Sequence, residues 1–137
     1  MFKIFLDTNV AFDLIANREP FIYNSFPLLE LVERGEAQLF VSEVSLGTLI
    51  YLAEKYKLPE AKVKLVNFVL MCGVISGGKE AFFGSMDSNF LDKEDGLQYS
   101  IALKNKMDFL LTRNKKDFKS ADGKIQILSP KEFFESR

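Results

Sequence analysis

The stretch Lys3-Ile4-Phe5-Leu6-Asp7-Thr8-Asn9 decides the fold that the sequence predicts. Its first four residues form a short apolar run, which is typical of a buried β-strand. A carboxylate, Asp7, follows the run directly. Asp, Thr and Asn all cap helices, so this polar turn also predicts a helix over Val10 to Ala16. A strand, a polar turn and a helix in this order indicate an α/β fold.

Four more runs of the same kind follow, namely Gln38 to Val41, Gly73 to Ser76, Asp108 to Thr112 and Lys124 to Leu128. Helical patterns lie between them, and their ends carry the usual signals. Helix starts are indicated by Pro20, before the helical spacing of Phe21, Phe26, Leu29 and Val32, by Ser42, and by Ser129-Pro130, and a helix end is indicated by Gly35. Another helix is expected over Gly96 to Lys106. Alternating strands and helices predict a mostly parallel central sheet with helices on both faces.

The length and composition predict a single domain over residues 1–137. The chain has 137 residues, of which 47% are apolar and 14 are Phe, enough to fill one core. No segment resembles a linker, and Gly77-Gly78 is interpreted as a loop. The start of the chain does not resemble a signal peptide, and no apolar run approaches the length of a membrane span. We therefore expect a cytoplasmic protein with no membrane association.

The composition excludes nucleic-acid binding through overall charge and also excludes an ordinary zinc site. The net charge is −1, so nucleic acid would have to bind through a local patch rather than through the charge of the whole molecule. The chain has no His and one Cys, which excludes the ordinary zinc-ligand sets. Any bound metal must therefore be held by oxygen atoms.

The candidate site residues lie just beyond the predicted strands, where the loops of a parallel sheet meet. Asp7-Thr8-Asn9 follow the first strand, and Arg113-Asn114-Lys115-Lys116-Asp117 follow the fourth. A cluster of acids, Asp92, Glu94 and Asp95, precedes the helix expected from Gly96. Each group also has a simpler structural explanation. Asp7 would then do no more than cap a helix, the acidic cluster would complement a helix dipole, and Asn114 would cap a turn.

Convergence of Asp7, Asp95 and Asp117 favours the functional interpretation. Carboxylates brought together repel one another unless a cation or a proton neutralises them. Carboxylate oxygens and water suit Mg²⁺ or Mn²⁺, which would lower the pKa of a bound water and stabilise charge on a phosphoryl group. Without His, general base chemistry would fall to a carboxylate or to that water. Arg113, Lys115 and Lys116 are the candidates for holding a phosphate backbone, although exposed lysines are also ordinary surface residues.

The segments Phe5-Leu6-Asp7-Thr8-Asn9-Val10, Asp92-Lys93-Glu94-Asp95-Gly96-Leu97-Gln98-Tyr99 and Leu111-Thr112-Arg113-Asn114-Lys115-Lys116-Asp117-Phe118 together resemble a PIN domain. The resemblance covers nearly the whole chain and is closest to the VapC-like toxins of toxin–antitoxin pairs. It implies a three-layer α/β/α fold and a Mg²⁺- or Mn²⁺-dependent ribonuclease that is often a homodimer and is held inactive by a small antitoxin.

The family's acidic positions fall here on Asp7, Thr48, Asp95 and Asn114. Asp7 and Asp95 match the first and third acids, whereas Thr48 and Asn114 are neutral, and Asp117 is the nearby acid that would replace the fourth. The expected supporting residues are Thr8, Asn9, Thr48, Asp92, Glu94 and Thr112. Glu43 is a poorer candidate, because complementing the dipole of the next helix already explains it.

Two alternatives to a nuclease remain open. The neutral Thr48 and Asn114 would also suit a PIN-like protein that binds RNA or a partner through a weakened metal site. A phosphatase or phosphotransferase with Asp7 as nucleophile ranks last. Such enzymes usually need a second acid two residues further on, where this chain has Asn9.

Overall fold

The structure, a computed structural model, describes residues 1–137 and is built around one five-stranded sheet in the order β3-β2-β1-β4-β5. All four strand pairs are parallel. The strands are β1 (Phe2–Leu6), β2 (Ala37–Ser42), β3 (Gly73–Ile75), β4 (Phe109–Leu111) and β5 (Gln126–Leu128). The five predicted strands are therefore all present, each with ends within two residues of the expected ones.

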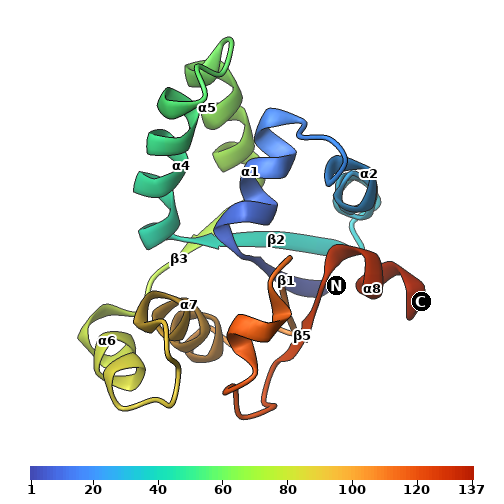
Figure 1. The fold of residues 1–137 in the computed structure, drawn as a ribbon. Helices are drawn as coiled ribbons and strands as arrows, with labels where there is room; N and C mark the ends of the chain where they lie inside the picture. Colours follow the sequence, from blue (N-terminus) through green and yellow to red (C-terminus); the bar gives the residue numbers. More distant parts are fainter.

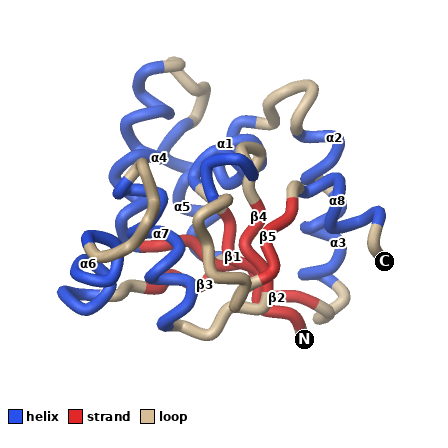
Figure 2. The backbone as a smooth tube through the Cα atoms, turned by 60° about the horizontal axis from the view of Figure 1, so that its bottom comes forward, coloured by secondary structure: helices blue, strands red, loops and turns tan.

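Helices cover both faces of this sheet (Figure 1). One layer contains α1 (Thr8–Ala16), α2 (Ile22–Ser25), α3 (Pro27–Glu33), α4 (Glu43–Lys55), α5 (Ala61–Met71) and α8 (Pro130–Glu135). The other contains α6 (Gly78–Met86), α7 (Lys93–Lys104) and the short 3₁₀ helix η1 (Lys115–Phe118). Figure 2 shows the sheet enclosed between these helices, which confirms the predicted three-layer α/β/α fold.

Alternate side chains of each strand enter two separate cores. Ile4 and Leu6 of β1 pack with Phe12 of α1 on one face of the sheet. Phe5, which lies between them in the sequence, packs with Tyr99 of α7 on the other face. All of these side chains are almost fully buried. The last three residues of β1, Ile4 to Leu6, are buried on both faces and form a continuous apolar run, as is usual for central parallel strands.

Several helix ends agree with the sequence signals. The Ser42 hydroxyl accepts a hydrogen bond from the Ser45 amide at 3.1 Å and caps α4. Ser129 and Glu132 form a reciprocal capping box at the start of α8, with Pro130 in its first turn. Gly35 follows α3 with a positive φ of 71°. These residues satisfy backbone groups that the helix ends would otherwise leave without partners.

Three helix predictions need correction. The segment after Pro20 forms two short helices, α2 and α3, because Pro27 lacks an amide hydrogen and begins a new helix. Helix α7 begins at Lys93 rather than Gly96, since Asp92 caps it by accepting hydrogen bonds from the Glu94 and Asp95 amides. Gly77-Gly78 is not simply a loop. Gly78, with φ of 59°, is the first residue of α6, and a Cβ at Gly77 would collide with Ala81.

The strand order places a topological switch beside β1. The chain proceeds from β1 to β2 and β3 on one side and then returns to β4 and β5 on the other. Loops leaving the carboxyl ends of β1 and β4 therefore diverge and leave a crevice, which is where ligands bind in open α/β sheets. No helix is both long enough and apolar enough to span a bilayer.

Candidate metal centre

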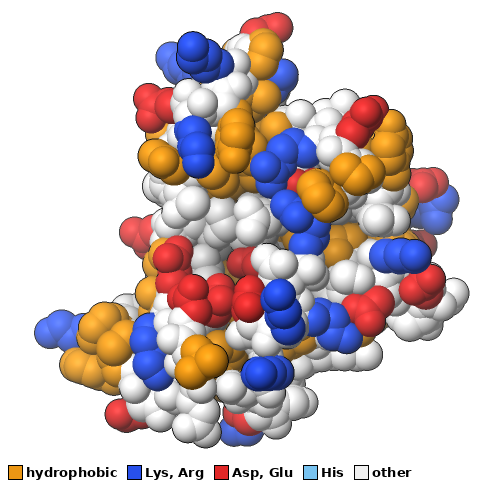
Figure 3. Space-filling view, in the orientation of Figure 1, with side chains coloured by type: hydrophobic (Ala, Val, Ile, Leu, Met, Phe, Trp, Pro, Cys, Tyr) orange, Lys and Arg blue, Asp and Glu red, His pale blue; other side chains and the backbone are white.

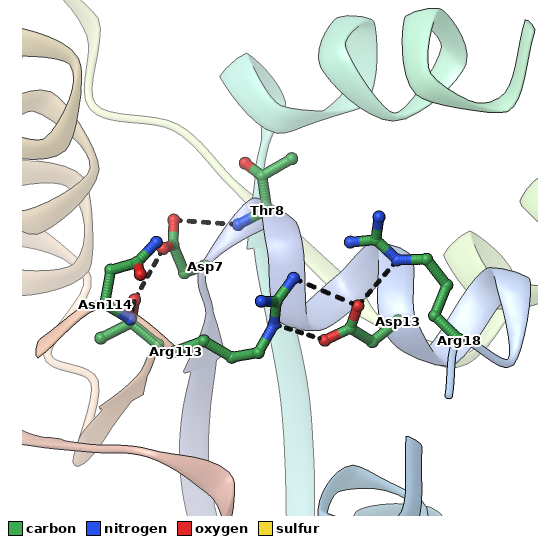
Figure 4. Close-up of polar contacts among 7 residues, drawn as sticks. Asp7, Thr8, Asp13, Arg18, Arg113 and Asn114 are labelled. Carbon is green, nitrogen blue, oxygen red and sulfur yellow. Dashed lines mark hydrogen bonds and ion pairs between the residues drawn. The ribbon is translucent and has the colours of Figure 1, made fainter. Parts of the chain in front are cut away.

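Asp7 stands at the carboxyl end of β1 and is held there by two hydrogen bonds to its carboxylate. Its Oδ1 accepts from the backbone amide of Thr8 at 3.0 Å, and its Oδ2 accepts from the hydroxyl of Thr112 at 2.8 Å. Thr112 follows β4 and in turn accepts a hydrogen bond from the Asn114 amide at 3.1 Å. Figure 4 shows this arrangement between the start of α1 and the loop after β4. Asp7 does cap α1, so its capping and site interpretations are compatible.

A cavity of about 310 Å³ opens beside Asp7 and is lined mainly by polar side chains. Its walls contain five acidic residues and no basic one. The lining residues are Asp7, Thr8, Asn9, Thr48, Leu52, Asp92, Glu94, Asp95, Gln98, Asn114 and Asp117. They come from the start of α1 and its N-cap, from α4, from the first two turns of α7 and its N-cap, and from η1 and the loop before it. Figure 3 shows acidic side chains gathered in a hollow in the middle of this face.

Burial and mutual repulsion raise the pKa values of the acids in this cavity. The pKa of Asp95 rises from 3.8 to about 7, through burial first and then through the charges of Asp92, Asp7, Asp117 and Glu94. Burial also raises the pKa of Asp7, although its hydrogen bonds from Thr112 and Thr8 oppose that rise. Excess negative charge of this kind favours a bound cation.

The residues at the two neutral family positions both reach the cavity. Thr48 projects from α4 and is half-buried, and Asn114 is exposed at the start of η1. Asp117 lies in η1 and lines the same cavity as Asn114. Glu43 instead lines a different pocket, beside Gly77 and Phe82.

The predicted basic residues lie outside the cavity. Arg113 is paired with Asp13, with Nε and Oδ2 2.8 Å apart, and its guanidinium stacks 3.7 Å from the centre of the Phe21 ring. Lys115 forms an exposed ion pair with Glu132 at 3.1 Å. Lys116 lines a neighbouring pocket of about 200 Å³, which shares Asp92 and Asp117 with the acidic cavity. Of the three, Lys116 is the one placed to meet a phosphate beside the acids.

The donor set suits a hard cation, with one qualification about geometry. Carboxylate, amide and hydroxyl oxygens are the ligands that Mg²⁺ and Mn²⁺ prefer. The acids line the cavity, but no group of three His, Cys, Asp or Glu side chains converges tightly enough to form a ready ligand cluster. This arrangement fits an ion such as Mg²⁺, which usually keeps several waters and takes only one or two carboxylates from the protein.

A buried hydrogen-bond network beneath the cavity was not predicted. Gln98 accepts from the Ser42 hydroxyl at 2.7 Å and donates to the Ser45 hydroxyl at 2.9 Å. The Ser45 and Thr8 hydroxyls are 2.8 Å apart, so the network supports the start of α1 from below. Gln98 follows Asp95 by three residues on α7, and this i,i+3 spacing is the sequence signal that could have identified it.

Asp13 was also not predicted. It lies on α1 with its side chain fully buried, between Arg113 and Arg18, whose Nε atoms are 2.8 and 2.9 Å from its carboxylate oxygens. Burial raises the pKa of Asp13, and the charges of Arg113 and Arg18 oppose that rise. An acid inside the apolar stretch Val10-Ala11-Phe12-Asp13-Leu14-Ile15 is the signal that sequence reasoning passed over.

Comparisons with known proteins agree with this fold. A family model described as PIN domain matches residues 3–116. The protein named Ribonuclease VapC1, from Aquifex aeolicus (strain VF5), is 29% identical over 138 residues, which cover 97% of this chain and 94% of that protein.

Three solved structures share the fold. VapBC2 from Rickettsia felis, bound to a DNA fragment from the promoter, has a TM-score of 0.69 at 20% identity, covering 91% of this chain and 96% of that one. A toxin–antitoxin complex from Klebsiella pneumoniae has a TM-score of 0.66 at 21% identity, covering 93% and 97%. VapBC-1 from nontypeable Haemophilus influenzae has a TM-score of 0.64 at 20% identity, covering 93% and 98%.

Proposed function

Because the chain belongs to the PIN domain family, we propose that it is an endoribonuclease that hydrolyses RNA phosphodiester bonds with Mg²⁺ or Mn²⁺ and acts as the toxin of a toxin–antitoxin pair. One observation carries the proposal: five acidic side chains and no basic one line a single cavity at the topological switch of the sheet. The relative named as a ribonuclease aligns over nearly the whole chain and adds support.

Asp7, Asp95 and Asp117 are the proposed metal-holding residues, with the Asn114 amide beside them. Asp92, Glu94 and Thr48 line the same cavity and would hold coordinated water. A divalent ion bound there would lower the pKa of an attacking water and offset charge that builds up on the phosphoryl group.

Other side chains would hold the Asp7 carboxylate in place and bind the substrate phosphate. Thr112 and the Thr8 amide fix both oxygens of Asp7, so this carboxylate cannot rotate freely. These contacts also count against Asp7 as a covalent nucleophile. Lys116 lies at the edge of the acidic cavity, where its ammonium could bind a phosphate next to the cleaved one.

RNA cleavage by the purified protein tests the proposal. Labelled RNA should be cleaved in Mg²⁺ or Mn²⁺ and remain intact in EDTA. Asp7→Asn should slow cleavage by more than roughly 100-fold, since losing a metal ligand costs more than losing an outer-shell group. Asp87→Asn is the matched control, because Asp87 is an exposed acid at the end of α6 and lies outside the cavity. Wild-type cleavage by Asp7→Asn would contradict the proposal.

A second candidate function is RNA or partner binding by a weakened metal site. It is favoured by the neutral side chains of Thr48 and Asn114 and by the lack of three tightly converging acids. It predicts that RNA binds without being cut and that Thr48→Glu increases the affinity for Mn²⁺. Ready turnover of RNA by the wild-type protein would rule it out.

We also propose that a small antitoxin binds and restrains this protein. A structure of the same fold is a toxin–antitoxin complex from Klebsiella pneumoniae. The support is an apolar groove of about 300 Å³ between α4 and α5, lined by Leu46, Leu49, Ile50, Leu65, Val66, Val69 and Leu70. An amphipathic helix could bury its apolar face in such a groove. A cytoplasmic location is proposed as well, because the RNA substrate is made and used there.

Self-association is proposed from a second apolar surface. Phe82, Phe83 and Met86 on α6 are each between 44% and 59% exposed. Burying these side chains in a homodimer would remove them from water. Light scattering of the wild-type protein and of Phe83→Glu should give dimer and monomer masses, respectively. Two monomeric samples would exclude this arrangement.

A further inference from the structure

Asp13 is a fully buried acid that the proposed chemistry does not use. Its carboxylate lies on the inner side of α1, six residues beyond Asp7. Burying a carboxylate is costly unless charged partners and hydrogen bonds compensate for the lost water. Here two guanidinium groups do so, one from the end of α1 and one from the loop after β4. Arg18 is 5 residues from Asp13 in the sequence and Arg113 is 100 residues away, so of the two only Arg113 connects α1 to a distant segment.

Arg113 connects Asp13 to the loop that carries the metal-site residues. Its Nε donates to Asp13 Oδ2 at 2.8 Å, and its guanidinium lies over the Phe21 ring. The preceding residue, Thr112, donates its hydroxyl to Asp7, and the following residue, Asn114, lines the acidic cavity. Arg113 is thus anchored between two residues of the site.

Two carboxylates, one at the N-cap of α1 and one inside the helix, therefore bind the loop after β4. Asp7, at the helix N-cap, accepts from Thr112, and Asp13 accepts from Arg113 in the helix interior. Figure 4 shows Arg113 reaching from beside Asn114 to Asp13. Strand β4 ends at Leu111, and the sheet makes one more hydrogen bond beyond it, from the Thr112 amide to the Leu128 carbonyl at 3.0 Å. The contact of Arg113 with Asp13 restrains the loop beyond Thr112.

Arg18 provides an internal comparison. It binds the other oxygen of the same carboxylate at 2.9 Å, but it lies between α1 and α2 and does not line the acidic cavity. Its Nη2 is buried without a hydrogen-bond partner. Losing Arg18 would leave Asp13 with one cation and would not release the loop after β4.

We propose that Asp13 is a positioning residue for the metal centre, acting through Arg113 to fix the Thr112–Asn114 loop and thereby the Asp7 carboxylate. The inference rests on the proposed metal-dependent function. It assigns to Arg113 a part distinct from direct RNA binding. Groups that orient metal ligands from behind typically alter metal affinity by about 10- to 100-fold when removed.

Calorimetric titration of the full-length protein with Mn²⁺ tests this role without requiring activity. Arg113→Met should weaken Mn²⁺ binding by about 10-fold, at the lower end of the range for such groups. Arg18→Met, the matched control, should bind Mn²⁺ within about 2-fold of the wild type, although it removes an ion pair to the same acid. Equal effects of the two variants on Mn²⁺ affinity would reduce Asp13 to a purely structural role and overturn the proposal.

A double-mutant cycle checks the route of the effect. Thr112→Val removes the last hydrogen bond before Asp7, so adding Arg113→Met to it should cause little further loss of Mn²⁺ affinity. Full additivity would contradict positioning through Thr112. If Arg113→Met does not fold, Arg113→Lys keeps the charge but loses the guanidinium geometry and should weaken Mn²⁺ binding measurably. Wild-type affinity in a folded Arg113→Lys protein would then refute the inference, whereas a wild-type protein without Mn²⁺ affinity would refute the metal site itself.

Discussion

Removing the charge of Asp95 should stabilise the metal-free protein while weakening its metal site. Asp95 lies in the first turn of α7 and faces four other acids across one cavity. Burial and those neighbouring charges raise its pKa to about 7 in the folded protein, compared with an ordinary value of 3.8. The charged carboxylate therefore opposes folding. Asn at this position would keep the shape of the side chain and remove that cost.

The size and pH dependence of this effect follow from the two pKa values. The cost is absent below the ordinary pKa of 3.8, grows as the pH rises, and is complete above about 7. The difference between a pKa of 3.8 and one of about 7 corresponds to roughly 4 kcal/mol at most. Asp95 is only partly buried, so solvent screening reduces this to on the order of 1–2 kcal/mol. Asp95→Asn should raise Tm by roughly 3–8 °C at pH 8 and by nearly nothing at pH 4.

Thermal unfolding in EDTA and in excess Mn²⁺ measures both halves of the prediction. Without metal, the Asp95→Asn variant should melt above the wild type, and Asp87→Asn should melt at the wild-type temperature. Saturating Mn²⁺ stabilises a binding protein by about 2.7 kcal/mol when its concentration is 100 times Kd, and this gain should be smaller in the variant. The order of the two Tm values should therefore reverse. A variant less stable than the wild type in EDTA at pH 8 would refute the electrostatic reasoning.

Further measurements address other parts of the molecule. Burial raises the pKa of Cys72 from 9.0 to about 12. Alkylation of its thiol at pH 8 should therefore be about 1,000-fold slower in the folded protein than after denaturation. Equal rates would contradict the burial of Cys72. Its thiolate forms more easily in the unfolded chain, which should also lower stability as the pH rises above 9.0. Ser129→Ala removes half of the capping box of α8 and should lower the free energy of unfolding by about 1 kcal/mol in denaturant titration; no change would mean that α8 does not depend on this cap. Lys116→Ala in an Asp7→Asn background should weaken RNA binding and reduce the slope of log affinity against log salt by about 0.7, whereas Lys62→Ala on α5 should leave the slope unchanged.

The fold was largely predictable because each strand is a short apolar run in the sequence. Ile4, Phe5 and Leu6 of β1 are buried on both faces of the sheet, so their continuous apolar run predicts a strand. Helices α5 and α6 gave weaker signals and were not predicted. On α5, Val66 and Leu70 are 50% and 79% exposed, so its apolar residues do not form a single inward stripe. Helix α6 opens with a glycine pair that, in sequence, indicates a loop.

The acidic residues could be predicted as a set, because they follow strands or open a helix next to the sheet edge. Their supporting contacts could not. Gln98 and Asp13 matter through partners that are distant in sequence, 56 residues away for Ser42 and 100 for Arg113. Such pairs depend on how helices pack, and local sequence patterns carry no information about that. The expectation that Arg113 faces RNA failed to anticipate its buried partner for the same reason.

The register between β1 and β4 brings the residues at the two strand ends together in one site. In the pairing of β1 with β4, Leu6 lies opposite Leu111, so Asp7 and Thr112 leave their strands side by side. A shift of one residue would reverse which face each side chain of β4 points to, and would turn the Thr112 hydroxyl away from Asp7. The same shift would expose Leu111, which is fully buried in the core beside α1. Core packing therefore fixes the register, and the register in turn supplies the hydrogen bond that holds the first carboxylate of the proposed metal centre.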